Sequence, residues 1–453
     1  MKARYLISFI IAIAATLPGL FLRLAGLHLA SPVATAAISG FAIVAAAFLL
    51  LWTCDAAQGE MSQALALAAV ALIAVLPEFA VDMYFTWQAG RFPQSNYGSF
   101  AIANMTGANR LLIGVAWALI AGLYWVRFRR DVVIEEERRT ELFFLGAATL
   151  YAFVIPLKGS LAWYDGLVLI GIYAAYIVLA ARRPSAEEPA QGPSELITAL
   201  PRAKRRLALI GLFLFAGVVI LANSESFCEG LLGTGRLFGI NEFLLVQWLA
   251  PIASEAPEFI IALMFAWRGQ AGLALGSLLS AKLNQWTLLV GMIPGVFAVA
   301  HGSVAHPLPM NNVQLSEILL TAAQSLLGIV LLAGLRLSIG AGVLLFGLFL
   351  AQFLLPLCSQ WFPGLAFGLG AAQAHPVLAV VYTIAATALF LQHPSDVRSL
   401  WKGLRVLPEP CGLRHKDEEA LPTPHCIHCE FRRMEEFMTT ADRELEEEVG
   451  SRK

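Results

Sequence analysis

The sequence predicts an all-α polytopic membrane protein with about twelve transmembrane helices, arranged as two inverted repeats with proline-broken helices. Of its 453 residues, 58% are hydrophobic and 14% are charged, whereas about 25% of residues are charged in an ordinary soluble domain. Apolar runs recur along nearly the whole chain at or near the roughly 20-residue length that spans a bilayer as a helix. They lack the period-2 alternation of a membrane barrel. The chain is therefore expected to cross a membrane many times.

Twelve spans are defined by apolar runs bounded by charges or by Pro/Gly clusters. In the first half (1–181) they are expected near 5–26, 33–53, 62–87, 99–125, 141–157 and 161–181. In the second half (207–392) they are expected near 207–222, 240–266, 271–299, 315–334, 337–356 and 372–392. The Pro/Gly/Glu-rich stretch 182–206 is expected to be a cytoplasmic linker, and 393–453 a polar cytoplasmic tail.

Basic residues fall on one side of these spans. If the N-terminus is inside, the inside set is Lys2, Arg4, Arg127, Arg129, Arg130, Arg138, Arg139, Arg182, Arg183, Arg202, Lys204, Arg205, Arg206, Arg268, Arg336, Arg398, Lys402 and Arg405. The outside loops hold little more than Arg23, Arg91, Lys158 and Arg236. Because short cytoplasmic loops carry the excess of Lys and Arg, both termini are expected in the cytoplasm, with the protein in an inner or plasma membrane. The net charge of −1 gives no field that would attract nucleic acid.

Each half carries a Pro-Glu pair inside a span, namely Pro77-Glu78 in the third span and Pro257-Glu258 in the eighth. Since these two spans are five apart, their helices run in opposite directions, as in transporters with inverted repeats. Proline leaves a helix carbonyl without its donor, and a carboxylate at the centre of a span costs at least about 2.5–3.5 kcal/mol. Two such glutamates at matching places predict an ion site.

Further polar groups cluster around the two glutamates. Asp82 lies four residues after Glu78, and Glu255 lies three before Glu258, so each shares a helix face with its partner. Neutral oxygens are available from Ser254, Asn104, Asn109 and Ser277. Hard cations such as Na⁺ and Ca²⁺ prefer oxygen ligands of this kind. The alternative is that the acids cap helix breaks, face a loop or a water-filled vestibule, or pair with a base.

These residues resemble the motifs of the sodium/calcium exchanger and cation/proton antiporter superfamily, whose two repeats each carry a Pro-Glu break followed by a small/polar helix. The likeness covers roughly 45–125 and 222–300. It implies exchange of one cation against another, with Glu78 and Glu258 as shared ligands. Ser254 matches a family hydroxyl, and Ser277 replaces the usual Asn or Asp. Asn104 and Asn109 match polar residues of the first small/polar helix.

The sequence also departs from the family pattern. Ala74 and Val75 stand where the family usually has Thr and Ser, and Glu255 replaces a hydroxyl. Lys282 stands where an Asn is expected, and Arg110 follows Asn109. A lysine amine can occupy a cation position as a tethered ammonium, or release its proton when a cation arrives; alternatively, Lys282 snorkels or pairs with Glu255. The transported ions are expected to be Na⁺, Ca²⁺ or H⁺.

The tail offers a second, separate metal hypothesis. Thiolate and imidazole ligands for zinc are available from Cys411, Cys426, Cys429, His425 and His428. They include one Cys-x-x-Cys pair, but a second pair with the spacing of a zinc site is missing. The alternative is a reduced, solvated tail. No other cofactor is expected.

Two other classes of function compete with an antiporter. An intramembrane enzyme is disfavoured because the sequence has no His-Glu-x-x-His, no Gly-x-Ser-x-Gly and no pair of histidines within one span. A cation channel remains open, since carboxylates also line pores, and so does a non-transporting sensor or scaffold. The expected partners are the lipid bilayer and inorganic cations, and the sequence points to no protein partner.

Overall fold

A computed structural model describes residues 2–27, 29–58, 75–182, 192–361 and 371–404. Within these residues, ten helical segments are long and apolar enough to cross a membrane, and α16 adds a shorter apolar stretch, Ile339–Leu355. The predicted span at 62–87 is described only from Val75 onward. The chain is thus a multi-pass helical membrane protein, as the sequence predicts.

The elements follow one another in two similar series. The first series is α2 (Pro32–Ala57), α4 (Leu76–Arg91), α5 (Tyr97–Leu111), the π-helix η2 (Leu112–Trp117), α6 (Ala118–Phe128), β1 (Val132–Val133), η3 (Glu136–Arg138), α7 (Arg139–Ala152), α8 (Ile155–Lys158), β2 (Ser160–Leu161) and α9 (Trp163–Ala180). The second is α11 (Arg202–Phe238), α12 (Glu242–Trp267), α13 (Ala271–Asn284), the π-helix η4 (Gln285–Leu289), α14 (Val290–Ala300), β3 (Leu308–Pro309), α15 (Asn312–Leu332), β4 (Arg336–Leu337) and α16 (Ile339–Trp361). Outside the series lie α1 (Lys2–Leu24), α10 (Ser194–Thr198), α17 (Ala371–Gln392), α18 (Pro394–Ser399) and η5 (Leu400–Leu404).

One long helix in each series is interrupted in the same way. In the first, 15 residues of α5 lead through a six-residue π-segment into the 11 residues of α6. In the second, 14 residues of α13 lead through a five-residue π-segment into the 11 residues of α14. π-Segments are rare and occur mostly at functional sites. Their recurrence at matching places identifies the two series as repeats.

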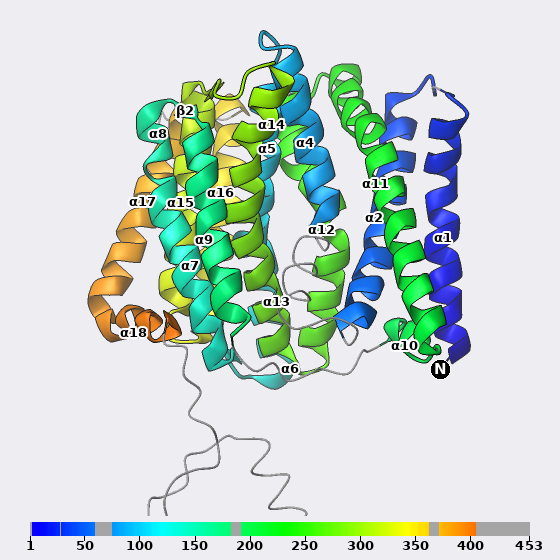
Figure 1. Ribbon diagram of the computed structural model, residues 1–453. Coiled ribbons are helices and arrows are strands. Elements are labelled where there is room, and N and C mark those ends of the chain that lie inside the picture. The colour runs from blue at the N-terminus through cyan, green and yellow to red at the C-terminus, as the bar shows by residue number, and fades with distance from the viewer. Residues whose placement is uncertain (1, 28, 59–74, 183–191, 362–370, 405–453) are drawn as a thin grey trace, which may run out of the picture. The chain divides into compact units, whose positions relative to one another are not determined.

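Two short antiparallel ladders join the repeats to each other. β1 pairs with β4, and β2 pairs with β3. By chain order β1 corresponds to β3, and β2 to β4, so exchanging the two repeats converts one ladder into the other. The chain's N-terminus, α6 and α18 lie at one end of the bundle, and α8 and β2 lie at the other (Figure 1). This arrangement confirms the inverted repeat.

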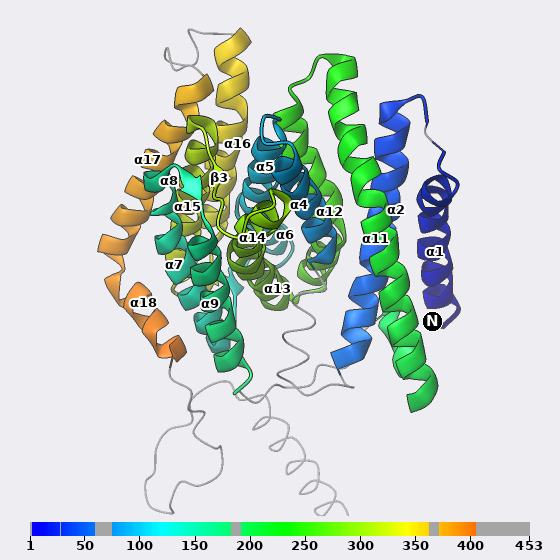
Figure 2. The same ribbon diagram turned by 45° about the horizontal axis from the view of Figure 1, so that its top comes forward.

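The helices that carry the predicted site lie between two groups of flanking helices. α11 packs against α2, α2 against α1, and α15 against α7 and α17. Both views place α4, α5, α12 and α13 between these groups (Figure 2). Each proline-containing helix also contacts the interrupted helix of the other repeat, since α12 packs on α5 and α4 on α14. The two repeats therefore meet where the predicted site residues lie.

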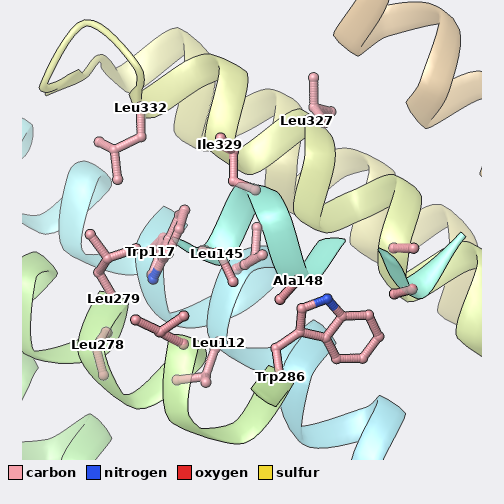
Figure 3. Packing of buried hydrophobic residues seen from close by; sticks show 14 of the residues in the cluster. Leu112, Trp117, Leu145, Ala148, Leu278, Leu279, Trp286, Leu327, Ile329 and Leu332 are labelled. Carbon is pink, nitrogen blue, oxygen red and sulfur yellow. The ribbon is translucent and has the colours of Figure 1, made fainter. Parts of the chain in front are cut away.

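A large apolar core contains residues from both repeats. Trp117 of η2 and Leu145 of α7 are fully buried and belong to the same cluster as Leu279 of α13, Trp286 of η4 and Leu332 of α15 (Figure 3). Because lipid tails are as apolar as these side chains, close packing rather than escape from water holds such helices together. The core thus gives the interrupted helices a rigid setting.

The seventh span is longer than predicted. α11 begins after Pro201, inside the predicted linker, and ends at Gly239, whose φ of 65° is a left-handed C-cap. The prediction ended this span at residue 222 because polar residues follow. Asn223 instead donates to the carbonyl of Val219 at 2.8 Å within the helix, and Glu225 pairs with a base on α1. Both polar side chains have partners, so the helix continues past residue 222.

The two prolines of the Pro-Glu pairs act differently. Pro77 stands in the first turn of α4, where its missing N–H is not needed. Pro257 lies inside α12, which continues through it without a break, contrary to the break expected in the eighth span. Proline still removes the donor for the Ala253 carbonyl. Pro77 thus stands at the start of a described helix, whereas Pro257 is accommodated within a continuous one.

Candidate ion-binding site

Three glutamates from the two repeats come together. The Glu255 carboxyl lies within hydrogen-bonding reach of the carboxyls of both Glu78 and Glu258. Glu78 and Glu255 are 1% and 2% exposed, and Glu258 is partly buried. Neither oxygen of Glu78 has a donor among the described residues. The first repeat thus supplies one of these carboxyls and the second repeat supplies two.

The glutamates do not form a ready metal cage. In the part of the chain that the structure describes, no group of three or more His, Cys, Asp or Glu side chains is spaced to hold a metal ion. The described structure thus has three neighbouring carboxyls without the spacing of a metal site.

A fourth carboxyl lies one helical turn from the first. Asp82 follows Glu78 by four residues on α4 and is fully buried. Asn104 of α5 donates its side-chain amide to Asp82 Oδ1 at 2.7 Å. Asp82 Oδ2 and Asn104 Oδ1 have no hydrogen-bond partner among the described residues. The α4–α5 contact thus adds two buried oxygens near the glutamates.

The second interrupted helix reaches the glutamates through its π-segment. Gln285, the first residue of η4, donates its side-chain amide to Glu255. Its own Oε1 is buried without a partner among the described residues. A π-turn shifts the helix register by one residue, which changes the face that the following side chains occupy. This interaction anchors Glu255 to the other helix of its repeat.

The amine of Lys282 is buried beside the first interrupted helix. It donates to Asn109 Oδ1 at 2.7 Å and to the Asn109 carbonyl at 3.3 Å, and it lies 4.6 Å from the centre of the Trp286 ring. The Asn109 amide donates to the carbonyl of Met105 at 2.8 Å, which turns its oxygen toward the amine. Lys282 is 0% exposed, so it does not snorkel. It also forms no ion pair with Glu255 in the described structure.

Arg110 belongs to a different cluster that the sequence analysis missed. Its guanidinium pairs with Glu317 of α15, and both side chains are fully buried. Glu317 also accepts a hydrogen bond from Gln247 at 2.8 Å and lies 2.8 Å from His375 of α17. The charge of Arg110 is therefore matched outside the glutamate site. Glu317 was passed over because it stands near the start of an apolar run.

Glu317 has a counterpart in the other repeat that could have revealed it. Glu141 stands early in α7, the helix that follows β1, as Glu317 stands early in α15, which follows β3. Glu141 accepts from Ser280 of α13 at 2.8 Å and pairs with Arg138 at 2.9 Å. Each of these glutamates thus contacts the interrupted helix of the opposite repeat. Their similar place in the two series, early in the helix after β1 and after β3, was the available signal.

The two predicted serines differ in position. Ser254 is buried next to Glu255 and donates to the carbonyls of Ala250 and Pro251, both at 3.3 Å. Ser277 is exposed on α13, and no interaction joins it to the glutamates among the described residues. The five tail residues proposed as zinc ligands lie outside the described residues.

One cavity of the described structure lies apart from the glutamates. It measures about 630 Å³ and lies where the α11–α12 turn meets the starts of α5 and α15. None of the predicted site residues lines it. This cavity therefore belongs to a different part of the bundle from the glutamates.

Comparison with known proteins agrees with these observations. The family described as sodium/calcium exchanger protein matches residues 31–182 and 208–357, which are the two structural repeats. A solved structure described as the H⁺/Ca²⁺ exchanger CAX is 37% identical, covers 89% of this chain and 98% of its own, and has a TM-score of 0.83. An uncharacterized membrane protein of Methanocaldococcus jannaschii is 22% identical over 54% of this chain and 71% of its own.

A second solved structure, the sodium-calcium exchanger NCX_Mj, covers 76% of this chain and 98% of its own at 18% identity, with a TM-score of 0.47. The family match covers most of the chain and coincides with both repeats. The chain belongs to the sodium/calcium exchanger protein family.

Proposed function

We propose that this protein is a secondary-active antiporter that exchanges Ca²⁺ for protons by alternating access. The observation that carries the proposal is the contact of Glu255 with both Glu78 and Glu258. These carboxyls come from both repeats. A carboxyl can hold either a proton or a hard cation, and carboxylate oxygens are the ligands that Ca²⁺ prefers. The 37% identical relative, described as an H⁺/Ca²⁺ exchanger, supports the same choice of ions.

The inverted repeat supplies the conformational change. In transporters of this architecture, one bundle rocks against the other around a fixed site near the middle of the membrane. Here the site residues lie on α4 and α12, and each helix packs against the interrupted helix of the other repeat. A relative movement of the two repeats would separate the carboxyls, admit a cation and expose the site to the opposite side. We place both termini in the cytoplasm, following the Lys and Arg distribution.

Transport into proteoliposomes tests this function. The purified protein should take up ⁴⁵Ca²⁺ when the vesicle lumen is acidic and the medium is alkaline, with no current steps in single-protein recordings. A Na⁺ gradient of the same size at uniform pH should drive much less uptake. Current steps would instead indicate a channel. If the Na⁺ gradient drove as much ⁴⁵Ca²⁺ uptake as the pH gradient, the proton would not be the specific counter-ion.

Site variants test the proposed ligands. Glu78→Gln and Glu258→Gln should each reduce uptake at least about tenfold, because a neutral amide neither carries a proton nor offers a charged ligand. Glu135→Gln is a matched control, since this carboxyl is 63% exposed before η3. Unchanged uptake in both site variants would remove these glutamates from the mechanism.

A further inference from the structure

One carboxyl of α11 joins that helix to two helices of the first repeat. Glu229 Oε1 accepts a hydrogen bond from the Tyr84 hydroxyl of α4 at 2.8 Å and another from the Tyr97 hydroxyl of α5 at 2.6 Å. The Gln88 amide donates to the Tyr84 oxygen at 3.2 Å, which leaves the Tyr84 hydrogen free to point at Glu229. The two tyrosine rings meet edge to face, with centroids 6.4 Å apart. Three helices therefore converge on one carboxyl oxygen.

This contact lies to one side of the predicted site. Residues of the α4–α5 turn and of the α11–α12 turn line the same cavity, so both turns lie at one end of the bundle, here called the turn end. Tyr84 follows Asp82 toward this end on α4, and Tyr97 is the first residue of α5, seven before Asn104. Seven residues of helix span about 10 Å. The Glu229 contact is therefore on the turn-end side of Asp82 and Asn104.

Apolar side chains surround the contact. Cys228 and Leu232 of α11 belong to the same buried cluster as Phe85 of α4 and Phe100 of α5. Because lipid tails are as apolar as these side chains, burial alone does not hold the helices together. Hydrogen bonds are directional, and they are stronger in such weakly polar surroundings than in water. Glu229 therefore gives α11 a defined position against α4 and α5.

The equivalent place in the other repeat is apolar. The two Pro-Glu pairs are 180 positions apart, and at the same offset Leu49 of α2 corresponds to Glu229 and Met264 of α12 to Tyr84. α2 packs against α12 as α11 packs against α4, and Leu49 is fully buried. Neither Leu49 nor Met264 can form a hydrogen bond of this kind. The carboxyl–tyrosine contact is thus present on one side of the two-fold relation and replaced by apolar packing on the other.

We propose that Glu229, Tyr84 and Tyr97 form a latch that holds α11 against α4 and α5 and closes the predicted site toward the turn end. When the latch is released, α11 moves away from these two helices, and the site opens toward that end. Because apolar packing takes its place in the other repeat, the two ends of the bundle open under different control. This proposal rests on the alternating access of the proposed exchanger.

Two buried cysteines report on the latch. Cys228 lies next to Glu229, whereas Cys54 lies near the end of α2, and both thiols are free and buried. Ala36 of α2 lies against Gly230 of α11. Cys54 follows Ala36 by 18 residues, or about 27 Å of helix. Movement of α11 at the latch should therefore expose Cys228 and leave Cys54 buried, whereas general loosening of the protein would expose both.

The rate of alkylation tests the latch. The full-length protein in nanodiscs without Ca²⁺ is treated with N-ethylmaleimide, and labelling of Cys228 and Cys54 is followed by mass spectrometry. Glu229→Leu copies the residue of the other repeat and removes the acceptor of both tyrosines. We expect Cys228 to react at least about tenfold faster in this variant, because two hydrogen bonds that favour the closed position are lost. The rate at Cys54 should not change.

A second variant removes the donors instead of the acceptor. Tyr84→Phe/Tyr97→Phe keeps the aromatic rings and should speed the labelling of Cys228 in the same way, so it tests the latch even if Glu229→Leu does not fold. An unchanged Cys228 rate in this double variant would overturn the proposal. An equal rise at Cys54 would also overturn it, because the variant would then loosen the whole protein.

Glu225→Leu is the matched control. Glu225 stands one turn before Glu229 on α11 but pairs with Arg23 of α1, so its loss should leave the Cys228 rate unchanged. A rise as large as in Glu229→Leu would mean that any lost carboxyl on this helix has the same effect, and the latch would be wrong.

Failure of the latch is distinct from failure of the proposed function. If the unmodified protein exchanges no ⁴⁵Ca²⁺ for protons in proteoliposomes, the exchange activity is wrong, whereas the labelling rates still decide whether the contact holds α11 closed. If it exchanges Ca²⁺ for protons and the labelling rates of the latch variants do not change, only the latch is wrong.

Discussion

The amine of Lys282 lies 2.7 Å from Asn109 Oδ1, so two residues at equivalent positions of the inverted repeats, each three before the first residue of its π-segment, are in direct contact. Because a two-fold relation maps each of them onto the other, their contact marks the place where the repeats meet. The same two-fold relation exchanges the β1–β4 and β2–β3 ladders. An amide in one repeat and an amine in the other occupy this contact, so the two halves are not equivalent there.

We predict that Asn109→Ala destabilises the protein. It removes the acceptor of a buried ammonium, and leaving such a group unsatisfied costs about 1–3 kcal/mol or more. Thermal unfolding in detergent should show a lower midpoint. Asn109→Asp retains an acceptor and should unfold at or above the midpoint of the unmodified protein. If both variants lowered the unfolding midpoint equally, the loss of stability would not come from the contact with Lys282.

We predict that Glu317→Gln is far more damaging than Glu225→Gln. Glu317 is the fully buried partner of Arg110, and removing one partner of a buried pair costs about 3–5 kcal/mol. Glu225 pairs with Arg23, but both side chains are more than 40% exposed, and an exposed pair contributes about 0–1 kcal/mol. The measurement is the change in unfolding free energy in detergent. A similar change in the two variants would refute this difference.

Gly107 is predicted to be essential for the packing of α5 on α12. A Cβ at this position would lie 1.8 Å from the main-chain oxygen of Gln247, and a backbone cannot move aside as a flexible side chain can. Overpacking of this kind costs about 1–3 kcal/mol, sometimes more. Gly107→Ala should therefore lower the unfolding midpoint and the yield of folded protein. Gly146→Ala on α7 is the control, because nothing lies within 4 Å of its added Cβ.

Ser254 and Ser277 should respond differently to alanine. Ser254 is buried beside Glu255 and bonds only to backbone carbonyls of its own helix, so its hydroxyl can turn toward a cation. Ser254→Ala should weaken the apparent affinity for Ca²⁺ by about threefold to tenfold, the scale of one hydrogen bond. Ser277 is exposed, and Ser277→Ala should leave uptake unchanged. A larger loss of ⁴⁵Ca²⁺ uptake in Ser277→Ala than in Ser254→Ala would instead place the hydroxyl ligand on α13.

Most of the fold was accessible from the sequence because its signals are local. Apolar runs of bilayer length and the one-sided placement of basic residues depend on composition within single segments. The Pro-Glu pairs at residues 77–78 and 257–258 gave the inverted relation by their positions alone. The predicted end of the seventh span was wrong because the polarity of a residue does not show whether it has a hydrogen-bond partner within the helix. Asn223 bonds within α11 instead of ending it.

The sequence by itself thus determined the membrane class, the opposed repeats and the identity of the acidic side chains, because a carboxylate inside an apolar run is costly wherever the chain folds. Only the tertiary structure decided the partners of those charges. It assigned Arg110 to Glu317, placed Lys282 against Asn109 and joined Glu255 to glutamates of both repeats. Such pairings link residues far apart in the chain, and side-chain contacts of this kind depend on how helices pack rather than on any local pattern.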